Sequence, residues 1–62
     1  MITKREKMEM LLAFQLMSLH SMEYDMLFRK ENNLPIQRLA YEISKTKDAI
    51  ASLEEELEKQ GV

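Results

Sequence analysis

The chain has 62 residues, with no Cys, one His, one Gly and one Pro, and its formal net charge is −2. This length limits it to one domain, residues 1–62, whose core supplies only roughly 3–5 kcal/mol unless a disulfide, a metal or a partner chain helps. The absence of Cys excludes a disulfide, and a single His argues against a structural zinc site. We therefore expect no metal and no cofactor, and we expect oligomerisation or the binding of a partner to supply the missing stability.

Hydrophobic residues make up 45% of the chain and charged residues 32%, which is typical of a globular protein. The small negative charge predicts no general attraction to nucleic acid or to an anionic membrane. The apolar stretch from Met10 to Leu19 is about half the ~20 residues that a bilayer span needs, and no small-residue cleavage site follows it. We expect no membrane span and a cytoplasmic location.

The first predicted helix covers about residues 3–31. Thr3 and Glu6 have the spacing of a capping box, in which each side chain bonds the backbone N–H of the other residue. Neither Gly nor Pro interrupts the chain from there to the end of the helix. Asp25 and Arg29 are spaced four apart, as in a helical ion pair.

The turn is expected at about residues 32–34, where Asn32 and Asn33 precede Leu34 and Pro35. Asn tolerates turn geometry, and the residue before Pro avoids the helical region. Pro35 suits the first position of a second helix over about 35–60, with Gly61 as its stop. So short a linker favours antiparallel neighbours. The fold class is therefore all-α, an antiparallel two-helix hairpin.

The second helix has one apolar stripe. Its large aliphatic side chains recur at alternating spacings of three and four, the heptad pattern of a helix that packs along a single seam. Thr46 takes one of these seam positions and is expected to fix the register or to bond back along its own helix. The seam that we expect to pack against the first helix consists of Ile36, Leu39, Ile43, Ile50, Leu53 and Leu57.

The first helix carries more apolar surface than the second can cover. Apolar residues occupy 14 of the 21 positions 8–28, but only 10 of the 25 positions 36–60. The uncovered side must meet another chain or remain an exposed patch of the kind that marks an interface. We predict a homodimer that forms a four-helix bundle. On the first helix, the predicted interface residues are Leu12, Phe14, Leu16, Met17, Leu19 and Met26.

Five of the six Met residues lie between Met8 and Met26. Flexible thioether side chains fill irregular gaps in a core and also suit adaptable binding surfaces. The sequence leaves both interpretations open: the Met-rich face is either the core of an oligomer or a groove for a different protein partner.

Basic groups at the start of the first helix and acidic groups at the end of the second are each unfavourable for an isolated helix. These charges become complementary in an antiparallel hairpin.

Two small basic clusters are candidates for contact with nucleic acid. Phosphate binding needs several converging basic groups, and neither cluster is large. Their residues are Lys4, Arg5, Lys7, Arg29, Lys30 and Arg38.

No catalytic set is recognisable: the sequence has no Cys–His pair, no Ser–His–Asp arrangement and no Gly-rich phosphate loop. His20 and Glu23 share a helical face, but the chain offers no second His to complete a metal site. We expect a non-enzymatic protein-interaction module, acting as a regulator, adaptor or assembly factor. A small dimeric RNA- or DNA-binding regulator is the first alternative.

Two short patterns resemble known families, although neither assigns the chain to one. Thr3-Lys4-x-Glu6-Lys7 resembles the helix start of the Rop family, small plasmid-encoded dimers that bind RNA hairpins, and implies an RNA contact at Lys4. Ser44 and Asp48 resemble the S-x-x-x-D signature of helical-hairpin phosphatases that act on a sporulation response regulator. That resemblance implies a second alternative, a phosphatase-like regulator of a response regulator, with these two residues as its acting pair.

Overall fold

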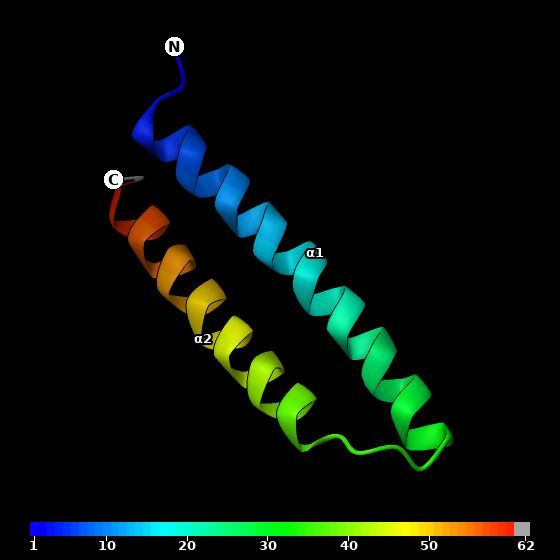
Figure 1. The fold of residues 1–62 in the computed structure, drawn as a ribbon. Coiled ribbons are helices and arrows are strands. Elements are labelled where there is room, and N and C mark those ends of the chain that lie inside the picture. The colour runs from blue at the N-terminus through cyan, green and yellow to red at the C-terminus, as the bar shows by residue number, and fades with distance from the viewer. Residues whose placement is uncertain (61–62) are drawn as a thin grey trace.

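The computed structural model describes residues 1–60 and contains two helices in that range, α1 (Lys4–Glu31) and α2 (Gln37–Gln60). The helices pack against each other in opposite directions and form a hairpin about 46 Å long (Figure 1). The start of α1 and the end of α2 lie at one end of this hairpin, and the turn lies at the other. The predicted all-α, two-helix hairpin is confirmed.

The predicted capping box starts α1. The Thr3 hydroxyl oxygen accepts from the Glu6 backbone N–H at 3.1 Å, and the Thr3 backbone N–H donates to Glu6 Oε1 at 3.2 Å. Two backbone N–H groups that helix geometry would leave without a partner are thereby satisfied. The cap fixes the start of α1 at the residue after Thr3.

The turn is organised by Asn33, whose φ of 55° places it in the left-handed region that Asn tolerates. The Leu34 N–H reaches back to the Arg29 carbonyl at 2.9 Å, and the Asn33 N–H reaches the Lys30 carbonyl at 3.4 Å. These two bonds form a Schellman motif, which satisfies carbonyls at the end of α1. Asn32 adds a side-chain bond, from Nδ2 to the Phe28 carbonyl at 2.8 Å.

The second helix begins at Gln37, two residues later than the start expected at Pro35. The Pro35 carbonyl accepts from Arg29 Nη1 at 3.2 Å, so it is engaged with α1, and the Ile36 carbonyl accepts from the Ala40 N–H at 2.8 Å. The chain thus stays extended for longer between the helices. Gly61, the expected helix stop, lies outside the described residues.

The core is a single seam between the helices. Ile50, in the middle of α2, is the one buried apolar side chain of residues 1–60, with 7% of its surface exposed. Seven positions at heptad spacing, Ile36 just before α2 and six within it, are buried or half-buried, and α1 is the element that packs on them. We call these positions the α2 seam: Ile36, Leu39, Ile43, Thr46, Ile50, Leu53 and Leu57.

The complementary charges at the open end of the hairpin do not form ion pairs between the helices. Within residues 1–60, every ion pair closer than 4 Å joins residues of one helix: Arg5 to Glu9, Arg29 to Asp25 and Lys59 to Glu55. The contact between His20 and Glu23 also lies within α1. Arg5 contributes to the helix pairing differently, because its Nη1 donates to the Leu57 carbonyl at 3.3 Å. That contact places a cation at the negative end of the α2 dipole.

Candidate protein-interaction surface

One side of α1 packs against α2. Seven of its half-buried side chains follow the same alternation of four and three as the α2 seam, with Ser18 and Asp25 half-buried beside them, and this regularity identifies the face that α2 covers. We call this row the α1 seam: Met8, Leu12, Gln15, Leu19, Met22, Met26 and Arg29.

A second heptad row occupies the opposite side of α1. Each of its positions lies two residues after a member of the α1 seam, and two residues correspond to a rotation of about 200° around an α-helix. All six positions are exposed and none is charged. We call this row the outer stripe: Met10, Phe14, Met17, Ser21, Tyr24 and Phe28.

The outer stripe is heavily exposed for such large side chains. The exposed fraction is 67% for Phe14, 72% for Met17 and 77% for Tyr24. On its flank, Leu27 is 62% exposed. Single exposed apolar residues are ordinary, whereas large contiguous apolar patches are typical of interaction sites.

The structure separates the predicted interface residues of the first helix into two groups. Leu12, Leu19 and Met26 lie in the α1 seam and are half-buried beneath α2, whereas Phe14, Leu16 and Met17 are exposed. The predicted residues of the second helix all belong to the α2 seam and are half-buried or buried. The surface available to another molecule is therefore on the side of α1 that points away from α2.

The predicted interface lacks four members of the α1 seam, Met8, Gln15, Met22 and Arg29. A heptad count that starts at Met8 includes all four. Tyr24, Phe28 and Leu27 were also absent from it, although they extend the exposed row toward the turn. The sequence contains a signal for Tyr24 and Phe28, because the same spacing of three and four links them to Met10, Phe14 and Met17.

The methionines divide between the two sides of α1. Met8, Met22 and Met26 are half-buried in the α1 seam, and Met10 and Met17 lie in the outer stripe. The Met-rich segment is thus not one surface. Part of it fills the hairpin core, and part of it is open to another molecule.

Hollows in the surface lie next to the outer stripe and between the helices. One of about 150 Å³ is lined by residues of α1 alone, Tyr24, Leu27, Phe28 and Glu31. Another, of about 360 Å³, lies between the helices and is lined by Glu23, Met26, Leu27, Ile43 and Lys47. Leu27 belongs to both, so it connects the outer face of α1 with the flank of the hairpin.

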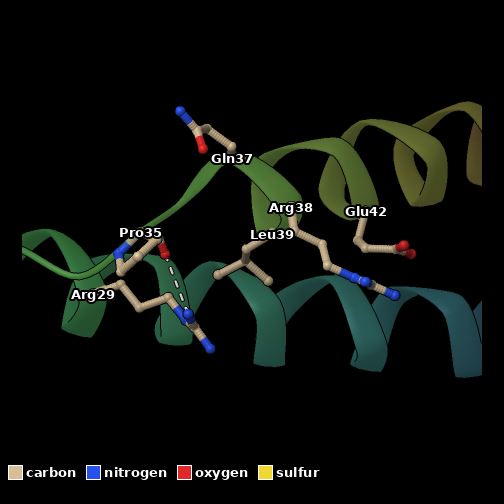
Figure 2. A pocket seen from close by; sticks show the side chains of 6 residues that line it. All are labelled: Arg29, Pro35, Gln37, Arg38, Leu39 and Glu42. Atoms are coloured by element: carbon tan, nitrogen blue, oxygen red, sulfur yellow. Dashed lines mark hydrogen bonds between the residues drawn. The ribbon is translucent and has the colours of Figure 1, made fainter.

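The two basic clusters lie at opposite ends of the hairpin. At the turn end, Arg29 and Arg38 line one hollow of about 350 Å³, together with Leu39 and Glu42 (Figure 2). Arg29 is also paired with Asp25 at 3.2 Å. Two carboxylates thus accompany the two guanidinium groups, and this balance does not favour a polyanion.

At the other end, Arg5 is paired with Glu9 at 3.1 Å and bonds the end of α2, while Lys4 and Lys7 are exposed. The two clusters are separated by most of the length of the hairpin, so the structure does not bring their six basic side chains together.

The remaining candidate groups are isolated on the surface. His20 Nδ1 lies 3.5 Å from Glu23 Oε1, and 73% of the His20 side chain is exposed. Within residues 1–60, no three His, Asp or Glu side chains gather as a metal site requires. Ser44 and Asp48 are both exposed, on the side of α2 that carries most of its charges.

The sequence matches no family of known proteins, no curated protein and no solved structure. Across residues 1–60, neither helix combines the length and the apolar character that a membrane crossing requires.

Proposed function

We propose that this protein is a non-enzymatic interaction module that self-associates through the outer stripe of α1 and acts as a small regulator, adaptor or assembly factor. The observation that carries this proposal is the uncharged heptad row opposite the α1 seam. A heptad row is the arrangement by which helices recognise other helices.

The energetics of the hairpin support association. A lone hairpin with one buried side chain has little hydrophobic stabilisation. Complete burial of a large apolar side chain contributes about 1.5–3 kcal/mol. The five large members of the outer stripe are each more than half exposed. Covering them therefore contributes an amount comparable with the whole stability of a domain of this size.

The position of the stripe supports one arrangement of four helices. In a square four-helix bundle, α1 has two neighbouring helices, and the directions from α1 to these two neighbours are about 90° apart. If α2 is one neighbour, the other does not cover the outer stripe, because the stripe lies on the side of α1 opposite α2. A second copy that covers the stripe must approach from the side opposite α2. We therefore propose a four-helix assembly with the two α1 helices at its centre and the two α2 helices outside.

A matched pair of substitutions tests this function. Met17→Glu places a charge in the middle of the outer stripe, and Ser52→Glu places the same charge on the exposed side of α2. Sedimentation velocity is expected to show a monomer for Met17→Glu and a dimer for Ser52→Glu, with the helical circular dichroism retained in both. A dimer that survives Met17→Glu would refute the role of the stripe.

A further inference from the structure

We infer that the partner of the outer stripe is a second copy of this chain, and that the two α1 helices pack antiparallel with Met10 of each copy seated in the hollow lined by Tyr24, Leu27, Phe28 and Glu31 of the other. This inference rests on the proposed function, because it specifies the geometry of the same surface. The shape of that hollow and the charges at the two ends of the stripe both favour this geometry.

The hollow has the form of a coiled-coil hole. Its four lining residues stand at positions i, i+3, i+4 and i+7 of one helix, which is the arrangement that receives one side chain of a facing helix. Its volume is about 150 Å³, comparable with a cavity that holds a benzene ring. The hollow therefore fits the end of one apolar side chain.

An antiparallel register pairs every member of the stripe with a suitable member of the second copy. Met10 faces Phe28, Phe14 faces Tyr24, and Met17 faces the small Ser21. In this register Met10 of the second copy lies over the middle of the hollow. Large residues are thus opposite large ones at the ends of the stripe, and a small residue accommodates a large one near its centre.

The charges at the two ends of the stripe select this sense and this register. Continuing the heptad row beyond Met10 reaches Lys7, and continuing it beyond Phe28 reaches Glu31. Both are exposed, and within residues 1–60 neither takes part in an ion pair. In the antiparallel register Lys7 of each copy faces Glu31 of the other.

The competing arrangements are less favourable. A parallel dimer sets Lys7 against Lys7 and Glu31 against Glu31, and opposed like charges are repulsive. Sliding the antiparallel pair by one heptad sets Glu31 against Phe14, or Lys7 against Tyr24, so a charge is buried against an aromatic ring. The proposed register is the one that both covers the apolar row and pairs its terminal charges.

Disulfide trapping tests the geometry, because the chain has no Cys of its own. Lys7→Cys and Glu31→Cys proteins, one of them isotope-labelled, are mixed in a thiol–disulfide buffer and resolved by mass spectrometry. Positions 7 and 31 are about 36 Å apart along α1, at ~1.5 Å per residue. The expected product is the mixed disulfide, in several-fold excess over a statistical mixture, whereas Lys45→Cys mixed with Glu31→Cys gives no such excess.

The outcomes separate the two proposals. An excess of the two symmetric disulfides would show a parallel dimer, and a statistical mixture would show that neither end is held. Either result overturns this inference while the self-association stands. If the native protein, which has no Cys, sediments as a monomer, that result overturns the inference and the proposed function together.

Charge reversal gives a second test that does not depend on trapping. Lys7→Glu alone is expected to raise the dimer dissociation constant roughly tenfold, and adding Glu31→Lys is expected to restore it. A Glu near the start of α1 favours the helix itself, so the weakening cannot be attributed to unfolding. An unchanged dissociation constant for Lys7→Glu would contradict the antiparallel pairing.

Discussion

The outer sides of the two helices face away from each other in the same hairpin, yet they differ in chemistry. On α1 this side carries Phe14, Met17 and Tyr24, and on α2 it carries Lys45, Asp48 and Lys59. Both sides are exposed in one chain, so exposure alone does not identify a binding surface. What distinguishes the α1 side is that its exposed residues repeat the heptad spacing of a packed seam without a charge among them.

The α2 side has features of a helix face that remains in water. Lys59 pairs with Glu55 at 3.5 Å, and Lys45 Nζ lies 5.4 Å from the centre of the Tyr41 ring. Tyr41 is the one large apolar side chain of Gln37–Gln60 that is exposed, and the Lys45 ammonium group lies over its ring. Contacts of this kind are made within one helix and need no partner chain.

The largest effect is expected from the seam between the helices. Ile50→Ala removes most of the buried side chain and is expected to cost about 2–4 kcal/mol, which is most of the stability of a domain this small. Urea unfolding followed by circular dichroism measures the loss. A midpoint unchanged from the native protein would mean that the helices are not held by this seam.

The outer stripe is expected to behave differently from the seam. Phe14→Ala is expected to lower the stability of the associated protein by about 1–2 kcal/mol per chain, because the ring is covered only in the dimer. The loss should diminish on dilution, whereas the loss caused by Ile50→Ala should persist. Thermal melts over a concentration series distinguish the two cases, and a loss independent of concentration would place Phe14 inside the single hairpin.

The cap of α1 offers a moderate effect that is local to one helix. Thr3→Ala removes the hydroxyl that accepts from the Glu6 N–H and is expected to cost about 1 kcal/mol. Thr3→Ser retains the acceptor and serves as the control. Amide exchange of the first turn of α1 should accelerate in the Ala variant alone, and equal exchange in both would show that the capping box does not hold the helix start.

The smallest effect is expected on the outer side of α2. Lys45→Ala removes the cation over Tyr41, a contact worth about 0.5 kcal/mol at an exposed site. Its sedimentation should match that of the native protein. A shift toward monomer would mean that α2 also takes part in the interface, and the contrast between the two outer sides would then be lost.

Much of the fold follows from short-range rules that the sequence displays. The capping box at Thr3, the break at Asn32 and Asn33, and the pair between Asp25 and Arg29 each depend on residues no more than four apart. The α2 seam follows from a regular spacing of aliphatic side chains. Rules of this range place the start and the end of α1 and the side that α2 buries.

The start of α2 and the division of α1 needed information from across the turn or across the hairpin. The Pro35 carbonyl bonds Arg29 of the preceding helix, and α2 begins only at Gln37. Because α1 is apolar on opposite sides, its composition did not reveal which row α2 would cover. Only the packing showed that Leu12 and Leu19 lie inside while Phe14 and Met17 lie outside.

Sedimentation equilibrium of the native 62-residue chain, over a range of micromolar concentrations, shows whether the outer stripe is covered by a second copy. Coverage of the outer stripe by a second copy predicts at least twice the monomer mass, with dissociation on dilution. A helical, folded monomer at every concentration would show that the outer stripe remains in water and would contradict the account.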